Sequence, residues 1–229
     1  MGEIVMNTIE ASPGKADAPT IEIAAHAGTC YGVQRALDMA LAAAPQAGES
    51  AQVHTLGPLI HNPIVVRELA EAGVGLADTL DDAASGTVVI RAHGVVPQVI
   101  EAARERGLTV VDATCPHVSR AQHAAAELAG EGCRVIVVGE AEVEGLTAWA
   151  EEAGGKVDVV AAPEEIPEGL YDPVGVVAQT TQRRENLEAV VAALRAAGLE
   201  PIVKNTICSA TRQRQEAAAD LASAVDAMV

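Results

Sequence analysis

The sequence has 229 residues, of which 49% are hydrophobic, so it can bury a sizeable core as one large domain or two modest ones. Aromatic residues make up only 1% and the net charge is −17, which argues against base stacking on single-stranded nucleic acid and against a broad polyanion-binding face. No apolar run approaches the roughly 20 residues of a membrane helix, and residues 1–20 lack a signal-peptide pattern, so we expect a cytoplasmic protein.

Residues 1–20 show no sustained periodicity and predict a flexible tail. From Thr20 onward, short β-branched runs alternate with Ala-rich amphipathic segments, which predicts the α/β class: parallel sheets with helices on both faces. The expected strands cover residues 21–25, 52–56, 87–92, 108–113, 134–139, 156–161, 174–179 and 201–204. The expected helices cover residues 31–44, 62–72, 97–106, 116–130, 144–153, 183–197 and 209–223.

A longer repeat lies on top of this alternation, because Cys30, Cys115 and Cys208 each immediately precede an expected helix at similar spacings. The repeat predicts pseudo-repeated lobes around a common site. We expect a first α/β lobe over 21–115 and a second α/β lobe over 116–204. Residues 205–229 would be the start of a truncated third lobe, since the chain stops in what resembles the beginning of a strand.

The cysteines are the main chemical signal. A reducing cytosol disfavours disulfides, and a helix N-terminus lowers the pKa of a thiol toward the metal-binding thiolate. Cys30, Cys115 and Cys208 are therefore predicted to share one metal site, whereas Cys133, at a strand start, suits a small buried residue. Three readings stay open on these residues alone: simple burial of all four thiols, zinc, and an iron–sulfur cluster. Zinc usually takes four ligands with a close pair, whereas iron–sulfur clusters accept dispersed thiolates.

A set of whole motifs carries a family resemblance. The segments, in chain order, are HAGTCYGVQRAL (26–37), TLGPLIHN (55–62), RAHGV (91–95), TVVDATCPHV (109–118), EVEG (142–145), AQTT (178–181) and NTICSATRQRQEA (205–217). Together they resemble the 4-hydroxy-3-methylbut-2-enyl diphosphate reductases, the LytB family, from residue 21 to the chain end. The resemblance implies a three-lobed α/β protein with one central 4Fe-4S cluster, held by Cys30, Cys115 and Cys208 with one iron left open.

The resemblance also implies an activity: an iron–sulfur oxidoreductase that removes the hydroxyl of 4-hydroxy-3-methylbut-2-enyl diphosphate. The products would be isopentenyl and dimethylallyl diphosphate, at the last step of non-mevalonate isoprene biosynthesis. The electron donor of the family is ferredoxin or flavodoxin, so the expected partners are a small allylic diphosphate and such a donor, with no nucleic acid and no membrane.

Four further residues match functional positions of the family. His61 and His93 match its diphosphate-binding histidines, and an imidazolium can neutralise an anion in a protein of negative net charge. Thr180 matches a threonine near the substrate hydroxyl. Glu142 matches the glutamate that relays a proton to the departing hydroxyl, and a dry pocket would raise the pKa of such a carboxyl group. Without the motifs, these would read as histidines in loops, a strand-end threonine and a solvated acidic turn.

Two departures from the family pattern are visible. Gly139-Glu140-Ala141-Glu142 lacks the His-Pro that usually precedes this glutamate, so one of three diphosphate histidines is missing. Losing such a charge-assisted bond costs about 1.5–3 kcal/mol, and an acidic residue near the diphosphate adds repulsion. Together these effects would weaken binding by about 10- to 1000-fold if nothing compensates. The Ser-x-Asn cluster and further serine of the third lobe also have no counterpart, so we expect a fragment that can be inactive alone.

These departures motivate two alternative functions. The missing His-Pro suggests a paralogue that keeps the cluster and acts on another allylic alcohol. The absent third lobe suggests a non-catalytic metal-binding or redox-sensing protein that uses the same three thiolates.

Overall fold

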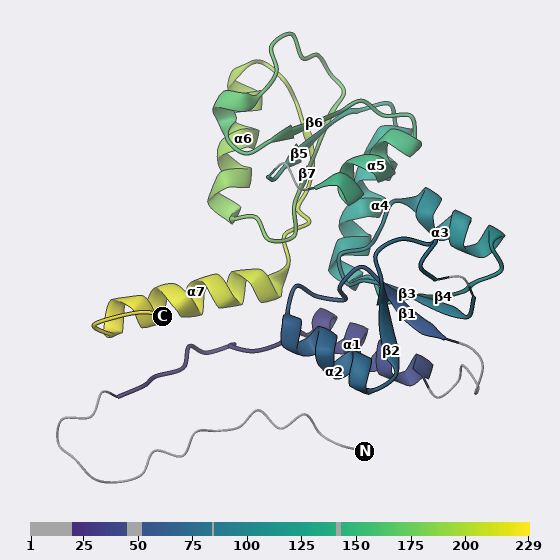
Figure 1. Cartoon of the computed structure of the whole chain (residues 1–229). Coiled ribbons are helices and arrows are strands. Elements are labelled where there is room, and N and C mark those ends of the chain that lie inside the picture. The colour runs from purple at the N-terminus through teal and green to yellow at the C-terminus, as the bar shows by residue number, and fades with distance from the viewer. Residues whose placement is uncertain (1–19, 45–51, 84, 141–142) are drawn as a thin grey trace.

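The computed structural model describes residues 20–44, 52–83, 85–140 and 143–229. Figure 1 shows two α/β lobes, each built on its own sheet, and a long C-terminal helix that extends away from both sheets. Each sheet has four strands, and every pair of neighbouring strands is parallel. The predicted α/β class is therefore confirmed.

The two sheets have the same topology. The strand order is β2-β1-β3-β4 in the first sheet and β6-β5-β7-β8 in the second. The first sheet comprises β1 (Val53–Leu56), β2 (Val74–Ala77), β3 (Thr87–Ile90) and β4 (Thr109–Asp112). The second comprises β5 (Arg134–Val138), β6 (Val157–Val160), β7 (Val174–Ala178) and β8 (Ile202–Lys204). This agreement supports the predicted internal repeat, while the residue boundaries assigned to the lobes stay a prediction.

The helices begin and end within one or two residues of the predicted positions. They are α1 (Tyr31–Ala43), α2 (Pro63–Glu71), α3 (Pro97–Glu105), α4 (Pro116–Gly130), α5 (Glu144–Glu152), α6 (Arg184–Ala196) and α7 (Ser209–Ala224), with a 3-10 turn at Pro163–Glu165. Proline opens α2, α3 and α4, where its fixed φ suits a helix and its missing N–H leaves no bond unmade. Among the helices that the structure describes, none combines the length and apolarity needed to span a membrane.

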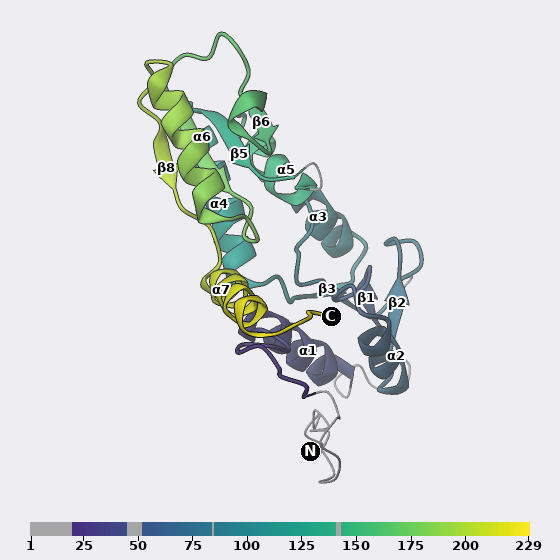
Figure 2. The same ribbon diagram turned by 90° about the vertical axis from the view of Figure 1, so that its left-hand side faces the viewer.

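Side-chain alternation along the strands explains why helices cover both faces of each sheet. In β5, Val135 and Val137 pack in the cluster of α4 and α5, whereas Ile136 and Val138 pack in the cluster of α6. Figures 1 and 2 show α6 and α5 on opposite sides of the second sheet. The first sheet follows the same rule, with α1 and α2 on one face and α3 on the other.

The structure corrects the prediction at two strands. Residues 21–25 form no strand, and Ile21 and Ile23 are 80% and 77% exposed. A strand exists only where a neighbour completes its hydrogen bonds, and none of the described segments pairs with this one. Conversely, β2 was not predicted, although it pairs along its whole length with β1.

Contacts between α5 and the first lobe join the two lobes. The indole Nε1 of Trp149 donates to the carbonyl of Val95 at 3.3 Å, and Gln98 hydrogen-bonds to Glu152. The ring of Trp149 also lies 5.0 Å from that of His123 on α4, centroid to centroid. The two lobes are therefore joined by specific side chains.

Candidate functional site

The predicted histidines lie where the topology of the first sheet favours ligand binding. In the order β2-β1-β3-β4, the connections from β1 and β3 leave in opposite directions, which opens a crevice at the carboxyl ends of these two strands. His61 follows β1 and His93 follows β3, and their ring centroids are 5.0 Å apart. The fold thus brings together two residues that are far apart in sequence.

The second sheet has the equivalent crevice between β5 and β7. Val143 and Gly145 of the EVEG segment follow β5 and Thr180 follows β7, so these residues lie at its mouth. Glu142 itself lies outside the described residues. A cavity of about 170 Å³ joins the two crevices. Its lining consists of His93, Val118, Ala121, Gln122, Val143, Gly145, Leu146, Gln179, Thr180 and Thr181.

Each of the three predicted cysteine ligands caps a helix. Cys30, Cys115 and Cys208 are the N-cap residues of α1, α4 and α7, with non-helical backbone and no capping hydrogen bond from the thiol. All three are free thiols. Their sulfur atoms therefore lie next to unpaired helix amides and are available as ligands. Cys133 is buried as predicted, and burial raises the pKa of its thiol.

Close packing joins the first two cysteine loops. A Cβ atom placed on Gly32, in the first turn of α1, would lie 2.4 Å from the Sγ atom of Cys115. The guanidinium of Arg35 on the same helix donates to the carbonyl of Thr114 at 3.2 Å. The N-terminus of α1, which Cys30 caps, is thus packed directly against the Cys115 loop.

Hydrogen bonds connect the third cysteine to the same region. The backbone N–H of Cys208 donates to the carbonyl of Thr180 at 2.9 Å, and that of Cys115 donates to Ala92, beside His93, at 2.9 Å. From α7, Arg214 donates to the carbonyl of Gly28, two residues before Cys30, at 3.1 Å. Each cysteine loop is therefore tied to another cysteine loop or to a strand end at the cavity.

The arrangement suits a cluster better than a single ion. Among the described residues, no three His, Cys, Asp or Glu side chains gather tightly enough to hold one metal ion. The ligands of an iron–sulfur cluster can lie farther apart than those of a single ion, because each thiolate binds a different iron. Three free thiols at three neighbouring helix starts have the donor chemistry for such a group, so the residues present fit a 4Fe-4S cluster.

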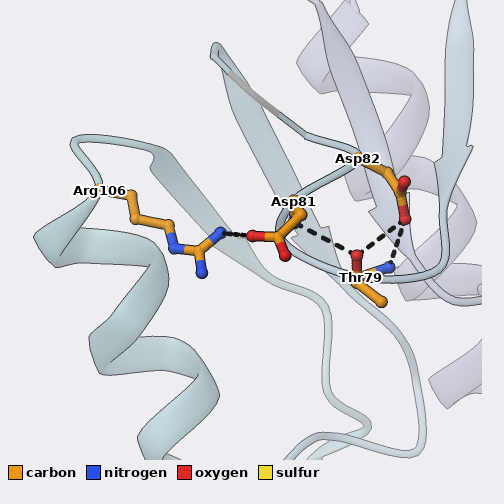
Figure 3. Close-up of polar contacts among 4 residues, drawn as sticks. All are labelled: Thr79, Asp81, Asp82 and Arg106. Atoms are coloured by element: carbon orange, nitrogen blue, oxygen red, sulfur yellow. Dashed lines mark hydrogen bonds and ion pairs between the residues drawn. The ribbon is translucent and has the colours of Figure 1, made fainter.

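The surroundings of His93 disfavour its protonated form. Partial burial of its ring lowers the pKa of His93, and the nearby positive charges of His61 and Arg91 lower it further. A second cavity of about 540 Å³ adjoins this point and includes His93, Arg91 and the loop after β2. Asp81 of that loop pairs at 2.6 Å with Arg106, the residue that ends α3, as Figure 3 shows. Without a ligand, His93 is thus held toward its neutral form in a cationic environment.

Motif reasoning missed one buried polar residue, Gln122. Its side chain is only 3% exposed, and its Nε2 atom has no hydrogen-bond partner among the described residues. In the sequence, Gln122 interrupts the run of alanine and leucine that α4 buries, and a buried amide on such a face is a recognisable signal.

Comparison with known proteins gives a consistent result. Residues 21–229 match the LytB protein family. A 4-hydroxy-3-methylbut-2-enyl diphosphate reductase of Citrifermentans bemidjiense is 47% identical over 212 residues, which cover 90% of this chain and 73% of that protein. The enzyme of the same name from Geobacter sulfurreducens is 46% identical over 215 residues, covering 91% of this chain and 73% of that protein.

Two solved structures have the same fold. One, described as (E)-4-hydroxy-3-methyl-but-2-enyl diphosphate reductase, the terminal enzyme of the non-mevalonate pathway, superposes with a TM-score of 0.76 at 42% identity, covering 90% of this chain and 74% of that one. The other, the E-1-hydroxy-2-methyl-but-2-enyl-4-diphosphate reductase from Plasmodium falciparum, gives a TM-score of 0.75 at 26% identity, covering 87% of this chain and 64% of that one.

Proposed function

The chain belongs to the LytB family, and we propose that it is an iron–sulfur reductase acting on 4-hydroxy-3-methylbut-2-enyl diphosphate. The products would be isopentenyl and dimethylallyl diphosphate, at the last step of the non-mevalonate pathway. One observation carries the proposal: a cavity that joins the two sheet crevices is bordered by the family's histidine, threonine and cysteine motifs. We expect the protein in the cytoplasm, because four free thiols suit a reducing compartment.

The reaction needs two electrons and two protons: the carbon–oxygen bond breaks, the hydroxyl leaves as water, and the allylic carbon skeleton gains a hydrogen. We propose that Cys30, Cys115 and Cys208 hold a 4Fe-4S cluster, which when bound supplies the electrons and an open iron as a Lewis acid. Its location at three helix N-termini supports this, because their dipoles offset the negative charge of a thiolate-ligated group.

The protein side chains then bind and orient the substrate. His61 and His93 are proposed to bind the diphosphate, and their 5.0 Å ring separation allows both to contact one anion. Thr180 is proposed to hydrogen-bond the substrate hydroxyl, and Glu142 to deliver the proton with which it leaves. The apolar lining from Val118, Val143 and Leu146 suits a five-carbon chain.

The electron donor is proposed to be a ferredoxin or flavodoxin. Such donors are acidic, and this chain has a net charge of −17, so docking needs a locally basic surface. A cavity of about 680 Å³ next to Cys208 includes Arg183, Arg184 and Arg212, although Glu216 pairs with Arg212 at 2.9 Å. This location next to a proposed ligand supports entry of electrons from that side.

The test is anaerobic purification followed by iron and sulfide analysis and a turnover assay with a reduced low-potential donor. We expect about four irons per chain, absorbance near 400 nm, and formation of both products. Replacement of Cys30, Cys115 or Cys208 by Ser should remove most of the cluster, whereas Cys133→Ser, the matched control, should leave it intact. Zinc without iron in the purified protein would contradict the proposal, as would equal cluster loss in Cys133→Ser.

The stretch from Gly139 to Glu140, which lacks His-Pro, favours a second candidate: a reductase of another allylic alcohol that keeps the cluster. The same assay separates the two. Activity on the standard diphosphate at an ordinary micromolar KM would exclude the second candidate. A full cluster without turnover of any allylic alcohol would instead indicate a metal-binding or redox-sensing protein.

A further inference from the structure

Gln122 is a buried polar side chain for which the fold provides no partner. It lies on α4, two helical turns after Cys115, and its side chain is 3% exposed. Its Nε2 atom has no hydrogen-bond partner among the described residues. Because water is excluded from such a position, an unmade hydrogen bond destabilises the ligand-free protein. An unpaired donor of this kind in a native structure requires an explanation.

The Gln122 amide lies at the junction of the two lobes. A Cβ atom on Gly94 would be only 2.7 Å from Nε2, so the absence of a side chain there lets the amide reach the loop that carries His93. Nε2 is also 3.6 Å from the corresponding position on Gly145, in the EVEG segment of the second lobe. Gln122 therefore lies against both the loop that carries His93 and the start of α5, and these two segments line the 170 Å³ cavity with it.

The charges near this amide indicate which part of a ligand it meets. His93 lines the same cavity, and the positive charges of His61 and Arg91 act on it. An anionic group is attracted to this end of the cavity, and its oxygens accept hydrogen bonds. Gln122 supplies a neutral donor in the same place, which adds a directed bond without a further buried charge.

We propose that Gln122 is a substrate-positioning residue whose Nε2 donates a hydrogen bond to a phosphoryl oxygen of the bound diphosphate. This inference rests on the proposed function, because it requires a diphosphate in the cavity. It also accounts for the missing histidine: a second-lobe donor to the diphosphate is present, on α4 instead of in the loop after β5.

The test replaces the amide by a side chain of similar length without donors, Gln122→Met, in the cluster-loaded full chain. Calorimetric titration uses inorganic diphosphate and dimethylallyl diphosphate, neither of which carries the substrate hydroxyl. We expect both Kd values to rise about tenfold, equivalent to about 1.4 kcal/mol. The Tm of the ligand-free protein should stay the same or rise, because an unpaired buried amide has been removed. Gln122→Glu, which adds a negative charge, should weaken binding further.

Gln52→Met is the matched control, since Gln52 is exposed at the amino end of β1, away from the cavity. It should change neither Kd nor Tm. Unchanged Kd values in Gln122→Met would overturn the inference while leaving the proposed function intact. A lower Tm with unchanged Kd would also overturn it, by assigning Gln122 a purely structural role. If the wild-type chain bound neither diphosphate, the proposed function would fail and the inference with it.

Discussion

A substitution at Gly32 provides the sharpest test of whether Cys30 and Cys115 bind the same cluster. A Cβ atom at this position would lie 2.4 Å from the Sγ of Cys115 and 3.3 Å from its Cβ. Non-bonded heavy atoms prefer separations of about 3.5–4.0 Å, so in Gly32→Ala the sulfur must retreat by about 1 Å or more. Rotation about χ1 of Cys115 is the easiest way to relieve this clash, and it turns the thiol away from its present direction.

The expected effects on stability and on cluster binding are therefore different. Overpacking costs about 1–3 kcal/mol, but replacing a helical glycine by alanine returns up to about 1 kcal/mol. The net loss of folding free energy in Gly32→Ala should thus be about 0–3 kcal/mol, measured by urea unfolding of the cluster-free protein. Functional sites tolerate misplacement of about 0.5 Å, so iron and sulfide content after reconstitution should fall by about half or more.

Gly130→Ala is the control, because Gly130 is also helical and its added Cβ would meet nothing within 4 Å. It should keep a full cluster and gain about 0.5–1 kcal/mol of stability. A Gly32→Ala protein with undiminished cluster content would refute the reasoning, since Cys115 could then not be a ligand in the orientation described here.

Two more predictions concern His93 and Thr206. Because the pKa of His93 is lowered in the folded protein, the unfolded chain binds the proton more readily, and stability should decrease as the pH falls below about 6.5. His93→Gln should flatten this part of the pH profile of Tm, and an unchanged profile would contradict the assignment. The Thr206 hydroxyl, 2% exposed, donates to the carbonyl of Ala178 and accepts from its N–H at 2.9 Å. Thr206→Val should cost about 1–3 kcal/mol in urea unfolding by leaving these buried groups unpaired, Thr206→Ser should cost less, and equal stability of all three proteins would rule out this role.

Much of the fold follows from local sequence signals. Helix starts were predicted well where a proline stands in the first turn, as in α4, because proline restricts where a helix can begin. The segment 21–25 has the alternation of a strand but no partner within the described residues, and sequence alone cannot supply a partner. β2 was missed for the opposite reason, since its four residues VGLA have little strand propensity and form a strand through pairing with β1.

The site was predictable to the extent that it consists of motifs. The motifs assigned His61 and His93 to one diphosphate, and the structure places their ring centroids 5.0 Å apart through the sheet order, while their role in binding stays a prediction. The cysteine ligand set and the roles of Thr180 and Glu142 stay predictions. The packing of Gly32 on Cys115 and the unpaired amide of Gln122 were not predictable, because both depend on distances between elements that are remote in sequence.

The contact between Trp149 and Val95 gives this protein a built-in optical probe. Trp149 is the only tryptophan in the sequence, and its indole hydrogen-bonds across the two lobes beside the ring of His123. The fluorescence emission of an indole depends on the polarity of its surroundings and on its hydrogen bonds. A change in the angle between the lobes therefore alters the emission of this one residue. Stopped-flow fluorescence of the unlabelled chain would therefore report whether ligand binding changes the contact between the lobes.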